Sequence, residues 1–244
     1  MSAPAAPARV LVWDLPVRVL HAAFALGVTG ALVLGFAVDD DHPLFAYHIL
    51  CGLFAAGALG LRVVWGLVGP GPARFARWPL SPGALVRHVR ALVGRAHAEE
   101  HEGHNPLASW VLLGLLAFTG ATVATGFAGG DDVHEALAIG LAGGVGLHLA
   151  GLLLHRFLTG ENPAPAMVDG RRRVAAAAAF PVRVRAVPGL VCCAALGLWA
   201  AVLVRGFDPG AGSLRLPFGL PTIALPVDGD GGEHDHDRDD HDDD

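Results

Sequence analysis

Four histidines lie within long apolar stretches, where an ionisable side chain is costly and usually functional. His134 and His148 stand fourteen residues apart in one stretch, and His21 and His48 stand in two earlier ones. In a helix, fourteen steps fall about 40° short of four full turns and cover about 21 Å along the axis. His134 and His148 therefore share a face. In a hydrocarbon core about 30 Å thick, each imidazole then lies near one surface.

Depth in the membrane pairs these histidines with one another. If successive stretches cross in opposite directions, His48 lies level with His134 and His21 lies level with His148. No other pairing of the four gives two level couples. Two imidazoles on facing helices can fill both axial positions of a haem iron, which leaves an electron-transfer centre with no open site. The spacing predicts two haems with His21, His48, His134 and His148 as iron ligands.

Alternatives remain open at some of these positions. A lone membrane histidine can be a hydrogen-bond donor between helices or part of a proton relay, but four with matched depths argue against that role. His155, beside Arg156, competes with His148 as the ligand. Arg18, Arg62 and Arg156 are candidate partners for haem propionates, because a guanidinium can bind a carboxylate through two hydrogen bonds. Small residues that would leave room for a flat macrocycle are Gly52, Gly140, Gly144 and Gly151.

The elements that must position these residues are membrane-spanning helices. The 244 residues are 53% hydrophobic and 16% charged, which is too apolar for an ordinary soluble domain. We expect an all-α polytopic membrane protein, with a four-helix transmembrane bundle that holds haem and a fifth, C-terminal transmembrane helix. A signal peptide in residues 10–37 is disfavoured, because the apolar run is too long and contains Arg18 and His21. The expected spans are 17–38, 44–68, 107–128, 133–158 and 187–204.

Loop charges predict the orientation of these spans. All 17 basic residues are Arg; they concentrate in the loops after the second and fourth spans, while the loops after the first and third are acidic. The positive-inside rule then places the N-terminus in the cytoplasm and the C-terminal tail in the periplasm, across a bacterial inner membrane. Residues 228–244 hold 10 of the 23 acidic residues, and we expect this His-rich tail to be disordered.

Several other segments are less specific. Ser81 and Pro82 begin an amphipathic basic segment that is expected to lie in the membrane interface. We expect the chain before Val12 to be mobile.

Three cysteines in apolar stretches, without a haem-attachment motif, are expected to be buried thiols: Cys51, Cys192 and Cys193. A solvated loop is expected around His97, His101 and His104, whereas His234, His236 and His241 in the tail are weak candidates for metal binding.

Five motifs in order resemble the bacterial cytochrome b561 family, which is related to the b-type cytochrome subunits of nickel–iron hydrogenases. They are VWDLPVRVLH at 12–21, RVVWGLVGP at 62–70, ARFARWPLSP at 73–82, GHNP at 103–106, and the segment 133–173 that begins VHEALA and ends DGRRR.

The resemblance covers about residues 10–173 and implies a di-haem b domain at 1–173. Its matched ligands are the same four histidines. It implies electron transfer between the quinone pool or a periplasmic redox partner and another carrier. The aromatic residue that often follows the first ligand is Ala22 here, and the helix at 187–204 and the tail lie beyond the resemblance.

The expected function is therefore electron transport in a respiratory chain. Its partners are the lipid bilayer and quinone, a c-type cytochrome or a peripheral redox subunit, with no nucleic acid. No catalytic triad or nucleotide-binding loop is present, so no catalytic residue is predicted. The main alternative is a divalent-metal transporter that collects metal on its tail, although transport sites usually gather ligands near the midplane. A membrane anchor subunit for a peripheral reductase would still carry haem.

Overall fold

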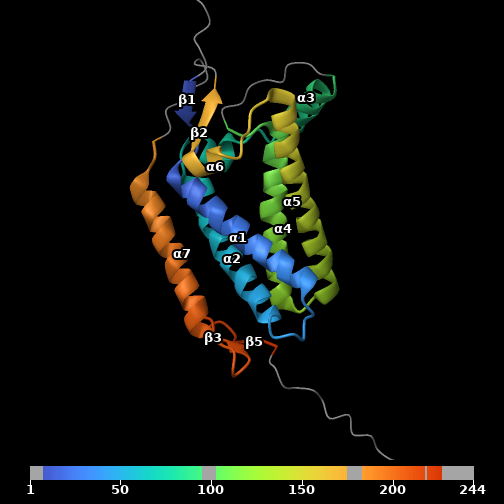
Figure 1. Cartoon of the computed structure of the whole chain (residues 1–244), viewed down its shortest axis with the longest axis vertical. Helices are drawn as coiled ribbons and strands as arrows, with labels where there is room; N and C mark the ends of the chain where they lie inside the picture. Colours follow the sequence, from blue (N-terminus) through green and yellow to red (C-terminus); the bar gives the residue numbers. More distant parts are fainter. Residues whose placement is uncertain (1–7, 95–102, 175–182, 218, 227–244) are drawn as a thin grey trace, which may run out of the picture.

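The computed structural model describes residues 8–94, 103–174, 183–217 and 219–226, and five of its helices are long and apolar enough to cross a membrane. The prediction of an all-α polytopic membrane protein is confirmed (Figure 1). The five spanning helices are α1 (Leu15–Ala37), α2 (Phe45–Val68), α4 (Pro106–Ala128), α5 (Asp131–Thr159) and α7 (Ala186–Gly206).

Four of the spanning helices form two antiparallel pairs, and the fifth packs against one of these pairs. α1 packs along α2, and α4 packs along α5, while α2 and α4 provide contact between the pairs. α7 packs against α1 and α2, on the side away from α4 and α5 (Figure 1). Every spanning helix runs opposite to the one before it in the chain, so His21 and His148 fall toward one end and His48 and His134 toward the other.

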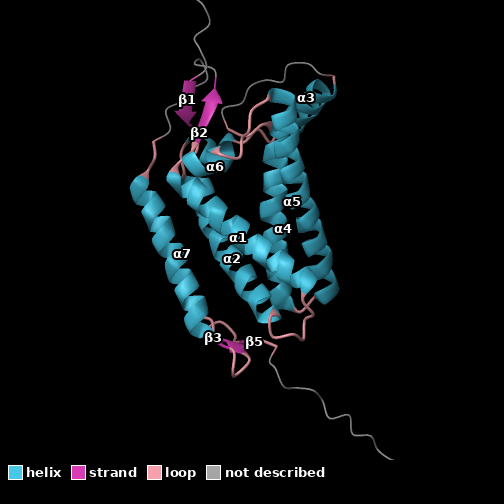
Figure 2. Cartoon of the chain, in the orientation of Figure 1, coloured by secondary structure: helices cyan, strands magenta, loops and turns pink. Residues whose placement is uncertain are grey.

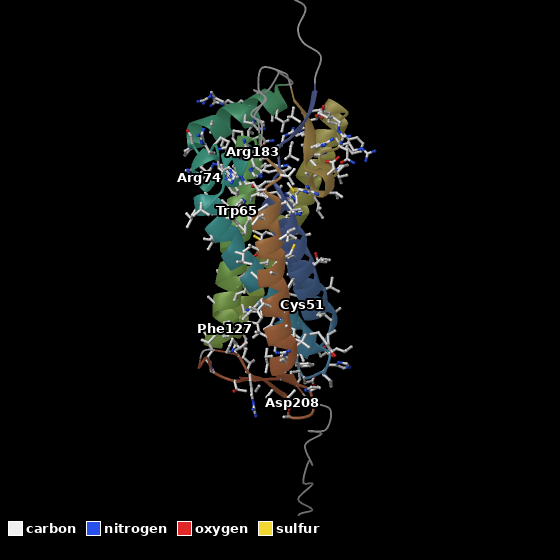
Figure 3. All side chains as sticks on the ribbon, turned by 90° about the vertical axis from the view of Figure 1, so that its left-hand side faces the viewer. Cys51, Trp65, Arg74, Phe127, Arg183 and Asp208 are labelled. Carbon is white, nitrogen blue, oxygen red and sulfur yellow. The ribbon has the colours of Figure 1, made fainter. Side chains whose placement is uncertain are left out.

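The two ends of the bundle differ in charge. At one end, which we call the arginine-rich end, α1, α4 and α7 begin. The opposite, acidic end carries the turns α1–α2 and α4–α5, with aspartates in both turns. Figure 3 shows Arg74 and Arg183 toward the first end and Asp208 at the second. The arginine-rich loops and the acidic loops of the sequence therefore lie at opposite ends of the helical bundle.

Local capping explains where the helices begin. The Asp14 side chain accepts a hydrogen bond from Val17 N at 3.1 Å, so α1 starts at Leu15, two residues before the expected span. Asn105 caps α4 in the same way through Ala108 N at 2.8 Å. Each of these caps precedes a proline in the first turn of its helix, where the missing N–H costs no helical hydrogen bond.

The arginine-rich end is covered by short elements. They are β1 (Ala8–Leu11), η1 (Gly71–Ala73), η2 (Phe75–Arg77), α3 (Pro82–Val93), α6 (Ala166–Asp169) and β2 (Arg171–Val174). β1 pairs antiparallel with β2, and Arg9 forms an ion pair with Asp169 at 2.6 Å. The expectation of a mobile chain before Val12 is wrong for Ala8–Leu11, because its partner strand lies far along the sequence.

The acidic end carries a second small sheet. β3 (Phe207–Asp208), β4 (Ser213–Leu214) and β5 (Ile223–Ala224) pair in that order. They lie just beyond the end of α7 (Figure 2). Leu214 is fully buried against Leu203 of α7 and Leu53 of α2. The sheet therefore fixes α7 to the end of α2 that carries His48.

An apolar layer crosses the middle of the bundle. It consists of the buried side chains of Val28, Ala55, Leu115 and Leu141, one from each of the first four spanning helices. Leu141 is buried on α5, seven residues from each of His134 and His148. The layer separates the two levels at which the histidines lie.

Large apolar side chains cover the outside of the spanning helices. Leu26 is 73% exposed and Phe157 is 82% exposed, and similar residues recur along every spanning helix. Cys193 is exposed on this surface, so the expectation of a buried thiol is wrong for Cys193 and correct for Cys192. A surface of this kind is unfavourable in water, whereas lipid tails cover it without cost. The bilayer is therefore a direct partner of the chain.

Candidate functional site

His48 and His134 face each other at the acidic end of the bundle. Their ring centroids lie 6.0 Å apart, and the ring planes meet at 75°. A metal ion held between two imidazoles, about 2 Å from each nitrogen, requires centroids about 6 Å apart. The separation in the structure therefore fits one metal centre bound between these two rings. Phe45 stacks on the ring of His48 with 4.7 Å between centroids.

A backbone carbonyl on α1 orients His48. His48 Nδ1 lies 2.8 Å from the carbonyl oxygen of Ala31. A carbonyl only accepts hydrogen bonds, so Nδ1 carries the proton and Nε2 keeps its lone pair for a metal. Gly35 follows one turn after Ala31, and a Cβ there would lie 2.8 Å from His48 Nδ1. The missing side chain lets the ring reach the carbonyl.

The same arrangement recurs on the partner ring. His134 Nδ1 lies 2.9 Å from the carbonyl oxygen of Thr122 on α4, and Thr125 Oγ1 lies 3.5 Å from the same nitrogen. Gly126 stands one turn after Thr122, and a Cβ there would lie 3.2 Å from His134 Cε1. Each ring of this pair thus rests on a carbonyl and a glycine four residues later on the neighbouring helix. Such outer hydrogen bonds set the tautomer and orientation of metal-binding imidazoles.

His21 and His148 form the corresponding pair at the arginine-rich end. The two imidazoles are near enough for their charges to interact, and Arg62 is close to His21. His155 instead lies near Arg172 and Glu161. Within the described part of the chain, neither ring of the His21 and His148 pair has a hydrogen bond, so both are free to bind a ligand. His148 is the histidine whose charge acts on His21.

The three arginines that the sequence singled out differ in their surroundings. Arg62 is half-buried, its guanidinium lies over the rings of Phe75 and Trp78 at 4.8 and 5.5 Å, and its Nη1 is buried without a hydrogen-bond partner. Arg18 donates to the carbonyl oxygen of Val168, and its Nε is buried without a partner. Arg156 is exposed on α5, so the structure does not bring it into this group.

His104 belongs to this end and was not predicted from the sequence. The expectation of a solvated loop is wrong for His104, whose ring lies between Trp13 and Trp78 with centroids 4.7 and 4.9 Å away. Burial lowers the pKa of His104 to about 3, and the nearby charges of Arg62, His148 and Arg172 act in the same direction. Two signals were available in the sequence: His104 stands just before the Asn105 cap of α4, and it belongs to the GHNP motif at 103–106. His97 and His101 lie outside the described residues.

The glycines near the histidines fall into two groups. Gly52 and Gly151 have no atom within 4 Å of where a Cβ would be, so both border open space. Gly140 and Gly144 instead allow α4 to approach, because a Cβ at these positions would lie 2.6 Å from Phe118 and 3.0 Å from Leu115. The two latter glycines therefore position α5 on α4.

The described residues contain no group of three or more His, Cys, Asp or Glu that could hold a metal ion by themselves. Binding of an iron that brings its own equatorial ligands needs only two axial side chains, which matches the paired histidines. The tail histidines His234, His236 and His241 lie outside the described residues.

Comparison with known proteins identifies the family. The model of the prokaryotic cytochrome b561 family matches residues 12–170, which include both histidine pairs and most of the chain. No curated protein and no solved structure matches the chain. The paired imidazoles and the free ring nitrogens fit the haem that this family binds. The chain therefore belongs to the prokaryotic cytochrome b561 family and is a multi-pass bacterial membrane protein that binds b-type haem and transfers electrons.

Proposed function

We propose that residues 1–173 bind two haems b, each between two imidazoles. His48 and His134 are the ligands of one haem, and His21 and His148 are the ligands of the other. The 6.0 Å separation of His48 and His134, with each Nδ1 facing a carbonyl, carries this proposal. The second pair is inferred from its matching level in the bundle and from the proximity of the two rings.

The chain's residues then perform three tasks. A haem with two axial imidazoles supplies a one-electron carrier that has no open coordination position. The carbonyls of Ala31 and Thr122 hold the ligand rings and their protons in place. The apolar layer around Leu141 excludes water between the two levels. Arg18 and Arg62, which have buried nitrogens without partners, offer positive charge to propionates at the arginine-rich end, and the exposed Arg156 is the third candidate.

The charges at the two ends of the bundle support an orientation in the membrane, and the family supports the redox partners. We place the arginine-rich end in the cytoplasm and the acidic end in the periplasm of a bacterial inner membrane, because arginine in short loops is retained on the cytoplasmic side. Electrons then pass between quinone, a c-type cytochrome or a peripheral redox subunit and another carrier, as in a respiratory chain. The 187–204 helix and the tail at 228–244 are additions to the cytochrome domain.

A reduced-minus-oxidised spectrum with pyridine haemochrome quantitation tests the proposal on detergent-purified protein. We expect two b haems per chain, both low-spin and unreactive with carbon monoxide. His48→Ala and His148→Ala should each remove about half of the haem, whereas His42→Ala, in the exposed α1–α2 turn, should remove none. A single haem in the unmodified protein would show that one pair is wrong. Absence of haem after expression with adequate supply would reject the cytochrome proposal, and divalent-metal uptake would then be assayed.

His155 needs a separate comparison. His155→Ala should retain both haems, because the charge interaction of His21 with His148 supports His148 as the second ligand. Loss of one haem from His155→Ala but not from His148→Ala would exchange their roles.

A further inference from the structure

Buried polar atoms without partners gather at the arginine-rich end. Among the described residues, the buried side-chain nitrogens and oxygens that lack a hydrogen bond are Asp14 Oδ2, Arg18 Nε, Arg62 Nη1, His104 Nδ1 and His155 Nε2. All five residues stand where α1 and α4 begin or where α2 and α5 end. A buried donor that stays unpaired costs about 1–3 kcal/mol, and a charged one costs more. Such a concentration indicates a binding site for a polar group.

Two of these atoms belong to residues that contact the same indole ring, that of Trp78. Trp78 packs against the Arg62 guanidinium at 5.5 Å and against the His104 ring at 4.9 Å. The Arg62 guanidinium also lies over the ring of Phe75 at 4.8 Å, and the His104 ring also packs against Trp13 at 4.7 Å. Trp78 is itself held by a hydrogen bond from its Nε1 to Pro72 O at 3.1 Å. Trp78 is therefore a shared neighbour of the guanidinium and the imidazole, and the charge of Arg62 acts on His104.

The charge around His104 selects the kind of ligand. The pKa of His104 falls to about 3, first through burial and then through nearby charges, of which Arg62 and Arg172 are permanently positive. Arg172 also donates to Gly103 O at 3.3 Å and so fixes the loop that carries His104. An imidazole that is kept neutral can donate from one ring nitrogen, and its cationic neighbours attract an anion. A planar carboxylate suits a guanidinium with an unused N–H beside it.

We propose that His104 and Arg62 together bind a carboxylate, namely a propionate of the haem that His21 and His148 hold. This inference rests on the function proposed above. Arg62 lies near both His21 and His104, so one guanidinium connects the ligand pair with the new residue. His104 is then a binding residue for the cofactor without being an iron ligand, and Trp13 and Trp78 are its positioning residues.

Two substitutions at His104 separate hydrogen bonding from packing. His104→Phe fills the space between the two indoles but has no donor, whereas His104→Asn keeps an N–H near the position of Nδ1. Spectroelectrochemical titration of the full-length di-haem protein measures the midpoint potential of each haem. Loss of a donor to a propionate leaves more negative charge near the iron, which disfavours reduction. In His104→Phe we expect the reduction equilibrium of one haem to fall up to about tenfold, or about 59 mV for one electron.

The unaffected haem between His48 and His134 serves as the internal control. His104→Asn should return the shifted potential most of the way toward that of the unmodified protein. Unchanged potentials of both haems in His104→Phe, with haem content intact, would overturn the inference. If His104→Phe does not assemble, His104→Ala is titrated in its place, and unchanged potentials in that variant would overturn the inference equally.

Esterified haem distinguishes a propionate from a carboxylate in solution. Full-length apoprotein is reconstituted with haem or with haem dimethyl ester, and the effect of His104→Phe is compared between the two. We expect the effect to disappear with the ester, because no propionate is left to lose a donor. An effect of equal size with the ester would assign His104 to another ligand and overturn the inference. Failure of the unmodified chain to bind any haem would instead reject the proposed function itself.

Discussion

Gly35 of α1 lies directly against the imidazole of His48 on α2, so that a Cβ at Gly35 would lie 2.8 Å from Nδ1 and 2.9 Å from Cε1. Real Cβ atoms do not approach this closely, and the ring cannot withdraw without leaving the carbonyl of Ala31. One hydrogen atom in place of a side chain thus decides whether His48 can keep the orientation that leaves Nε2 free.

Gly35→Ala is therefore expected to remove the haem between His48 and His134. Pyridine haemochrome analysis should show about half of the haem lost, with the second haem retained. The matched control is Gly143→Ala on α5, where a Cβ meets no atom within 4 Å. That control should keep all of its haem, and full haem content in Gly35→Ala would contradict the prediction.

Gly126→Ala should have a milder effect on the same haem. Its Cβ would lie 3.2 Å from His134 Cε1 and 3.3 Å from Nδ1, so a displacement of a few tenths of an ångström relieves the contact. We expect the haem to stay bound with a changed midpoint potential, since the hydrogen bond to Thr122 would be altered. Redox titration measures the change. Complete haem loss would show that the ring cannot move at all.

The buried carboxyl of Asp14 makes stability depend on pH. Burial raises the pKa of Asp14 above its ordinary value of 3.8, despite the opposing effects of Val17 N–H, the Trp65 indole, Arg185 and Arg62. The folded protein then holds this proton more tightly than the unfolded chain. The resulting stability is complete below pH 3.8 and is lost as the pH rises through the raised value.

Asp14→Asn should remove that pH dependence and keep the helix cap, because its amide oxygen still accepts from Val17 N. Thermal unfolding in detergent, from just below pH 3.8 to neutral, should show the unmodified protein losing stability relative to Asp14→Asn. Asp14→Ala removes the cap and should cost about 0.5–2 kcal/mol of unfolding free energy throughout. If the unfolding temperatures of the unmodified protein and of Asp14→Asn changed in parallel with pH, the raised pKa of Asp14 would be refuted.

Docking of α7 depends on Gly57 of α2. A Cβ at Gly57 would lie 2.4 Å from Trp199 Cδ1, and Trp199 Nε1 donates to Leu53 O at 2.9 Å. Gly57→Ala should lower the unfolding temperature while both haems stay bound, because none of the four proposed iron ligands takes part in the contact between Gly57 and Trp199. Gly60→Ala, three residues later with no neighbour within 4 Å, should leave the unfolding temperature unchanged or slightly raise it. Haem loss from Gly57→Ala would mean that α7 supports the cofactor sites.

Cysteine labelling tests the orientation of the bundle. Single cysteines are placed at Asp40, in the α1–α2 turn, or at Arg74, at the opposite end, after the three native cysteines have been replaced. A membrane-impermeant maleimide should label Asp40→Cys in intact spheroplasts and Arg74→Cys only after lysis. The reverse pattern would invert the proposed topology without affecting the haem assignment.

Much of this architecture could be predicted from periodicity and hydropathy. Helical spacing placed His134 and His148 on one face, and counting helix directions placed His48 level with His134, where the structure brings their rings together. The supports of those rings could not be predicted, because Gly35 and Gly126 resemble the many other glycines of apolar helices. His104 was misjudged for a related reason: acidic neighbours in the sequence suggested solvent, while Trp13 and Trp78 come from distant segments.

The small sheets were missed because they depend on long-range pairing. Neither ARVL nor RRRV has the alternation of a half-buried strand, and the two strands that pair are separated by the first four spanning helices. The sheet after α7 likewise packs against the end of α2, which lies far from it in the sequence. Local sequence patterns report which side chains prefer burial, but not which distant backbone will be adjacent.

The pairing of β1 with β2 brings together the two ends of the segment that contains the first four spanning helices. Because Ala8 lies opposite Val174, the chain enters and leaves its first four spanning helices at the same place. The first four spanning helices therefore form a unit whose two ends meet, and α7 and its sheet pack against α1 and α2 of that unit. A peripheral protein fused after β2 would meet the same surface that the N-terminus occupies, and a circular permutant that joined these two ends would need only a short connector.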